Sequence, residues 1–192
     1  MKTFHNDPAI KEKYIARVKA HMEADEIEKG YYWENGKGCA VGCTIEGSDH
    51  EKYEIELGIP KEIAYLEDSI FENLPNELAK TFPLRFLEAI PVGADLSKVT
   101  AHLVVWQFED PKWGLKNIQE VIDDKEIYGF CEDVVALYKR ILAGEEVPQS
   151  EFLELYNKID RARARAGAGA WAGAWAIEAL SEKLIDLLKN AK

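Results

Sequence analysis

The sequence predicts a mainly α-helical protein: a single-domain multi-helix bundle with one small β-hairpin near residues 31–45. Three observations predict this class. Apolar residues recur at helical spacing along most of the chain, prolines stand where helices can begin, and the turn pair Asn35-Gly36 follows a short aromatic run. The 192 residues are enough for one domain with a substantial core, and no long linker interrupts them. We therefore expect residues 1–192 to form one helical domain.

The first helix is predicted to start at Asp7-Pro8, because Asp is a favourable N-cap and Pro is preorganised for the first helical position. Its apolar periodicity extends toward Gly30, where we expect it to end. Residues 31–34 are aromatic enough for a strand. Residues 39–45 are too short and too apolar for periodicity to distinguish a return strand from a short helix.

The middle of the chain reads as linked short helices. Ser48 or Asp49 caps one that Gly58 ends, and Pro60 starts the next. Proline cannot continue a helix interior, so the following stretch is divided at three positions, Pro75, Pro83 and Pro91. Further helices are expected at residues 95–106, 115–122 and 127–142.

A long helix rich in Ala, Gly and Trp is predicted at about residues 150–190. Arg161 and Arg165 share a helix face, and Trp171 and Trp175 share a face by the same four-residue spacing. The arginines suit either a solvated, salt-bridged face or the recognition of phosphate. The tryptophans suit either a helix crossing or a wall for a flat ligand such as a nucleobase.

Composition limits the classes of partner. The net charge of -11 argues against a surface for nucleic acid or for an anionic membrane. Three cysteines, an odd number, indicate reduced thiols rather than a disulfide framework, and the polar N-terminus lacks the apolar core of a signal peptide. We expect a cytoplasmic protein.

The segment at residues 31–44 is the leading candidate site, because it combines aromatics, glycines and two cysteines. Its glycines allow either a ligand or another backbone to come close. Backbone N–H groups, a lysine and a threonine could together hold an anion. The candidate ligand-binding residues of this segment are Trp33, Asn35, Lys37, Gly38, Cys39, Gly42 and Thr44. We add Arg85, an isolated charge among apolar residues, together with Arg161, Arg165, Trp171 and Trp175.

Cys39 has an alternative interpretation as the nucleophile of a thiol-dependent enzyme, with His50 or His102 as the base. The competing interpretation is that Cys39 and Cys43 are small, buried apolar residues. No metal site or cofactor is expected, because the Cys39/Cys43 pair lacks a second pair of closely spaced ligands.

Four blocks carry a resemblance: Gly-Cys-Ala-Val-Gly-Cys at 38–43, Glu-Leu-Gly-Ile-Pro at 56–60, Leu-Glu-Asp at 66–68 and Phe-Leu-Glu-Ala-Ile-Pro-Val-Gly-Ala-Asp-Leu at 86–96. The chain resembles an uncharacterised group of bacterial and phage proteins. The resemblance implies a microbial or viral cytosolic origin. With a phage origin, it implies the host cytoplasm as the location and a role in counter-defence. It implies no activity and no functional residue.

The leading functional hypothesis is a non-enzymatic protein that binds a small anionic molecule resembling a nucleotide, as a phage protein sequestering a host signal would. The alternatives are the thiol-dependent enzyme and an acidic inhibitor that covers a basic surface of a host protein. A homo-oligomer is compatible with each.

Overall fold

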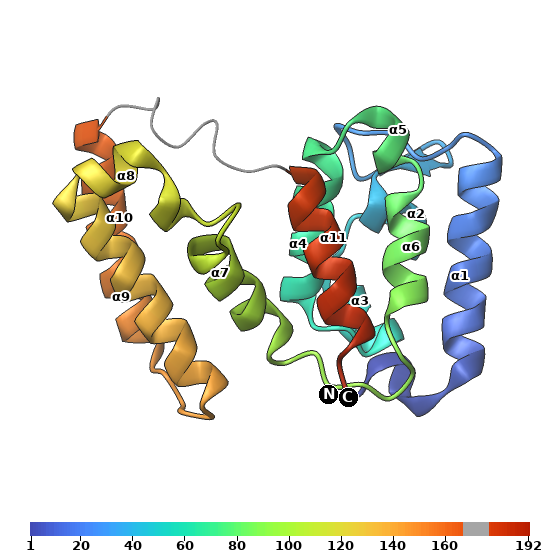
Figure 1. Ribbon diagram of the computed structural model, residues 1–192. Coiled ribbons are helices and arrows are strands. Elements are labelled where there is room, and N and C mark those ends of the chain that lie inside the picture. Colours follow the sequence, from blue (N-terminus) through green and yellow to red (C-terminus); the bar gives the residue numbers. More distant parts are fainter. Residues whose placement is uncertain (167–176) are drawn as a thin grey trace. The chain divides into compact units, whose positions relative to one another are not determined.

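The computed structural model describes residues 1–166 and 177–192, with side chains for residues 1–158 and 177–192. The chain divides into two compact units, residues 1–100 with 180–192, and residues 101–179. Each unit is described by itself. The described residues are mainly helical and include one small two-stranded sheet, which confirms the predicted fold class (Figure 1).

Helix α1 (Pro8–Glu23) begins as predicted, with the Asp7 side chain accepting a hydrogen bond from the Ala9 N–H at 2.8 Å. The predicted end near Gly30 is wrong. The helix ends at Glu23, and Asp25 follows with a positive φ of 56°, a conformation that a right-handed helix cannot contain. The chain thus leaves the helix about two turns earlier than its periodicity suggested.

Strands β1 (Trp33–Glu34) and β2 (Lys37–Gly38) form the predicted hairpin, with Trp33 opposite Gly38. Asn35 and Gly36 make the turn, and both have a positive φ, as a type I′ turn requires. Helix α2 (Ala40–Ile45) starts directly after the hairpin. The structure therefore decides the open alternative at residues 39–45 in favour of a short helix.

Helices α3 (Glu51–Leu57) and α4 (Lys61–Asn73) are separated by Gly58, whose φ is 62°. Helix α4 is amphipathic, and its buried side carries Ile63, Ala64, Glu67, Ile70 and Phe71. The short helices α5 (Asn76–Ala79) and α6 (Phe82–Ala89) follow, as the proline positions predict.

Helix α11 (Ile177–Lys189) completes the first unit and buries a stripe of Leu180, Leu184, Ile185 and Leu188. Arg85 of α6 donates to both carboxylate oxygens of Glu182 on α11, at 2.8 and 2.7 Å. The two chain ends are anchored close together, because Ala94 accepts from the Thr3 N–H and Lys192 accepts from the Asp95 N–H (Figure 1).

The second unit contains most of α7 (Val99–Glu109), then η2 (Leu115–Asn117), α8 (Gln119–Asp123), α9 (Lys125–Leu142) and α10 (Gln149–Ala166). The predicted helix at residues 95–106 starts later, at Val99, because the Asp95 side chain accepts from the Ser97 N–H in a turn. The helix predicted at 115–122 is divided into η2 and α8 by the extended backbone of Ile118.

The long C-terminal helix predicted at about 150–190 contains a segment outside the described residues, 167–176, which carries Trp171 and Trp175. The described parts are α10 and α11. Among the described helices, none combines the length and apolar composition that crossing a bilayer requires.

Candidate functional site

The first element of the site is a close backbone crossing that fixes Cys39. A Cβ added at Gly38 or Gly42 would lie 1.9 or 1.5 Å from the carbonyl oxygen of Tyr32, so only glycine fits at either position. The Cys39 N–H donates to the carbonyls of Tyr31 and Tyr32, both at 3.1 Å. The space that these glycines leave is therefore taken by another stretch of backbone.

Cys39 is the N-cap of α2, and its Sγ accepts a hydrogen bond from the Gly42 N–H at 3.4 Å. Its side chain is fully buried. Cys43, one turn later, is equally buried, but its thiol donates to the carbonyl oxygens of Gly38 and Glu26. The two cysteines of the segment therefore have different surroundings.

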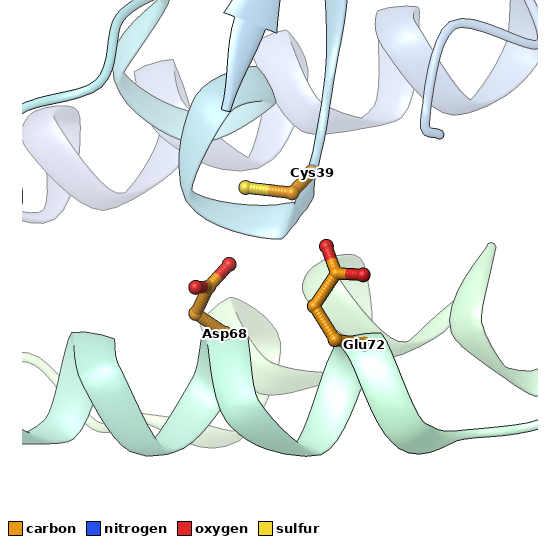
Figure 2. A group of neighbouring side chains, drawn as sticks. All are labelled: Cys39, Asp68 and Glu72. Atoms are coloured by element: carbon orange, nitrogen blue, oxygen red, sulfur yellow. The ribbon is translucent and has the colours of Figure 1, made fainter. Parts of the chain in front are cut away.

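Two carboxylates face Cys39 from α4, where Asp68 and Glu72 stand one turn apart (Figure 2). The Cys39 Sγ and one carboxylate oxygen from each acid all lie within 4.8 Å of one another. Glu72 is held in place by the Gly30 N–H, which donates to both of its carboxylate oxygens at 3.2 and 3.1 Å. We call these three residues the Cys39 cluster.

His50 lies beside the Cys39 cluster and is only 6% exposed. Its ring is stacked on Tyr65, with centroids 4.3 Å apart, and meets the edge of Tyr32 at 5.1 Å. The Nε2 atom lies 3.9 Å from Oδ2 of Asp68, which is too long for a hydrogen bond. Within the described part of the chain, neither this buried Nε2 nor Oδ1 of Asp68 has a hydrogen-bond partner.

A third carboxyl, Glu67, lies on the buried side of α4 and is fully enclosed. The Tyr53 hydroxyl donates to it at 2.7 Å. Burial raises the pKa of Glu67 to about 8, and the neighbouring charge of Asp68 acts in the same direction. Glu67 is thus a neutral core carboxylic acid at acidic and near-neutral pH.

The surroundings of Cys39 disfavour its thiolate. Burial raises the pKa of the Cys39 thiol well above its ordinary value, and Asp68 raises it further, although the Gly42 N–H opposes this shift. A reactive cysteine needs the reverse, a positively charged and partly exposed setting. His50 approaches Asp68 and not the sulfur, so this histidine is not placed to act directly as the base of the thiol-enzyme hypothesis.

The other predicted site residues lie elsewhere. Lys37 is paired with Glu28 at 2.5 Å, and Arg85 with Glu182. Trp33 packs edge-on against His21, and Asn35 is in the hairpin turn. Thr44 is buried and donates to the Ala40 carbonyl. Among the predicted ligand-binding residues whose side chains the structure describes, Cys39 alone belongs to the cluster. The side chains of Arg161 and Arg165 and the residues Trp171 and Trp175 lie outside the described residues.

Sequence reasoning missed Asp68 and Glu72, and it considered His50 only as a base for the thiol. A signal was present in the four-residue spacing of the two acids, which places like charges on one helix face at a cost of about 0.2–0.5 kcal/mol. The sequence could not show that these two acids of α4 face Cys39 in the folded protein. Because Cys39 and Cys43 lacked a second ligand pair in sequence, their spacing gave no indication of a mixed sulfur and oxygen set.

No family model matches this chain, and neither curated proteins nor solved structures yield a match. The candidate site therefore stands on the distances, burial and hydrogen bonds given above. The resemblance to bacterial and phage proteins stays a prediction.

Proposed function

We propose that this protein binds a divalent transition-metal ion of the zinc class through Cys39, Asp68 and Glu72. The observation that supports this proposal most directly is that three donor atoms lie within 4.8 Å of one another. In addition, the buried Nε2 of His50, without a hydrogen-bond partner among the described residues, lies 3.9 Å from Asp68. Small shifts of these side chains would bring the donors to the 2.0–2.3 Å that Zn–O and Zn–S bonds require.

The electrostatics of the Cys39 cluster support a cation. Two acids one helical turn apart repel each other, and a buried thiol cannot ionise without a compensating positive charge. A dication removes both penalties, because it attracts the carboxylates and converts the thiol to a coordinating thiolate. Thiolate is a soft donor, so the set favours zinc-class ions over Mg²⁺ and Ca²⁺, which prefer oxygen ligands alone.

The neighbouring groups suit the support of a metal centre. The Gly42 N–H is directed at the sulfur, and the Gly30 N–H holds Glu72. His50 needs only a small movement to donate to Asp68 and fix its orientation. Hydrogen bonds of this kind orient ligands and typically change metal affinity by about 10-fold to 100-fold when removed.

A thiolate ligand also agrees with the predicted cytoplasmic location. All three cysteines are free and buried, as expected for a protein of a reducing compartment. The nucleotide-binding hypothesis stays a prediction from the sequence. Its two described cations, Lys37 and Arg85, are each paired with a glutamate, so the described residues favour a cation site.

The test is metal binding by purified full-length protein after chelator treatment. We expect Zn²⁺ to bind with one equivalent per chain in competition with a chromogenic chelator, and Co²⁺ to give a sulfur-to-cobalt charge-transfer band. Cys39→Ser should abolish that band. Cys43→Ser is the matched control, because Cys43 is an equally buried thiol outside the cluster, and it should retain the band. The proposal would be overturned if the protein bound the metal only weakly and this binding were unchanged in three variants, Cys39→Ser, Asp68→Asn and Glu72→Gln.

A further inference from the structure

A cavity of about 220 Å³ adjoins the Cys39 cluster and is lined by Gly30, Tyr31, Tyr32, Asp68 and Glu72. The two acids belong both to the cavity wall and to the cluster, whereas Cys39 is fully buried. An ion bound by the cluster would therefore have its sulfur ligand on the protein side and the cavity near its oxygen ligands.

The donor set leaves the ion with room for another ligand. Zinc in reactive sites commonly has three protein ligands and a fourth position filled by water or substrate. Here the mutually close donors are Cys39, Asp68 and Glu72, and His50 approaches Asp68 alone. The fourth position would thus be supplied from the cavity.

Charge and shape restrict what can fill that position. A thiolate and two carboxylates around a dication give a net charge of about -1, so another anion would be repelled. Tyr32 is also among the residues that line the cavity; it is 43% exposed, and its ring is edge-on to His50. An uncharged donor on a flat ring satisfies both restrictions, and imidazole-type nitrogen suits zinc-class ions.

We propose that the metal centre binds a neutral aromatic nitrogen heterocycle, with the ring nitrogen on the ion and the ring against Tyr32. This inference rests on the metal site proposed above. Binding is a ligand exchange in which the heterocycle replaces a water molecule on the ion and no proton is transferred. The chemical class includes imidazoles, pyridines and purine nitrogens.

The experiment uses full-length protein loaded with Co²⁺, whose visible spectrum responds to a change of ligand. The probes are imidazole, methylamine, acetate and inorganic phosphate. We expect imidazole to shift the spectrum in a saturable manner and the two anions to leave the spectrum unchanged. Methylamine should bind more weakly, because an alkyl amine is protonated near neutral pH and has no free lone pair for the ion.

A matched pair of variants tests the role of the aromatic wall. Tyr32→Ala should weaken imidazole binding about threefold to tenfold, as expected for the loss of one aromatic contact. The backbone carbonyl of Tyr32, which makes the crossing with Gly38 and Gly42, is retained in this variant. Tyr65→Ala is the control, because Tyr65 contacts the same histidine and is 54% exposed but does not line the cavity.

The failure of this inference can be distinguished from that of the metal proposal. If Co²⁺ binds with its thiolate band but imidazole leaves the spectrum unchanged, the proposal of a heterocyclic ligand is wrong and the metal-site proposal stands. The heterocycle proposal would also be overturned if acetate or phosphate bound as tightly as imidazole. The same holds if Tyr32→Ala and Tyr65→Ala lost imidazole affinity to an equal extent. If the thiolate band never forms, the metal site itself fails.

Discussion

The carbonyl oxygen of Tyr32 occupies the position that a side chain at Gly42 would need, because a Cβ there would lie 1.5 Å from that oxygen. This crossing attaches the segment before the hairpin to helix α2 and fixes the backbone on either side of Cys39. The glycine spacing at 38 and 42 is therefore a requirement of packing between two stretches of backbone.

Gly42→Ala should destabilise the protein by about 1–3 kcal/mol, because the added methyl group must displace backbone that neighbouring hydrogen bonds hold. The measurement is urea unfolding followed by circular dichroism. Gly47→Ala is the control in the same unit, since its nearest neighbours would be 3.7 and 3.8 Å from the new Cβ. Equal unfolding midpoints for the two variants would contradict the crossing.

The three thiols should react slowly with a thiol reagent in the native protein at pH 8. All are buried, and burial raises the pKa of Cys43 to about 12 and that of Cys131 to about 11, with Cys39 also raised. Denaturant should expose all three to rapid reaction. Rapid labelling of Cys39 in the folded protein would instead support the thiol-enzyme hypothesis.

Stability should fall as the pH rises from about 4.5 to about 8, because of Glu67. Its pKa is raised from 4.5 to about 8 in the folded protein, so over this interval the native state holds a proton that the unfolded chain has lost. One such group contributes a slope of up to about 1.4 kcal/mol per pH unit. The measurement is urea unfolding at several pH values with chelator present.

Glu67→Gln should remove this slope, since the amide stays neutral throughout. Glu62→Gln, an exposed glutamate on the same helix, should leave the slope in place. A slope that survives in Glu67→Gln would mean that other groups produce the pH dependence.

The nucleotide hypothesis makes a prediction about two arginines. If Arg161 and Arg165 bind an anionic ligand, replacing either with alanine should weaken binding by about 1.5–3 kcal/mol, the value of a charge-assisted contact. Calorimetry against mono-, di- and cyclic nucleotides measures the effect. No binding of any nucleotide, or unchanged binding in both variants, would refute the hypothesis.

Much of the fold could be predicted because its signals act over a few residues. Asp7 caps the helix that Pro8 begins, Asn35-Gly36 makes the hairpin turn, and Gly58 ends α3 with a positive φ. Helix ends were less predictable, as Glu23 and Val99 show. Apolar periodicity reports which residues can face a core and does not report where competing turn contacts interrupt a helix.

The sequence by itself determined the helical class, the hairpin and the special character of the segment around Cys39. Only the tertiary structure decided what that segment meets: the Tyr32 carbonyl against Gly38 and Gly42, and the carboxylates of Asp68 and Glu72 against the Cys39 sulfur. Residue spacing places groups on one face of their own helix. Which faces then meet is decided by packing between elements distant in sequence, and this packing brings the thiol and the two acids together.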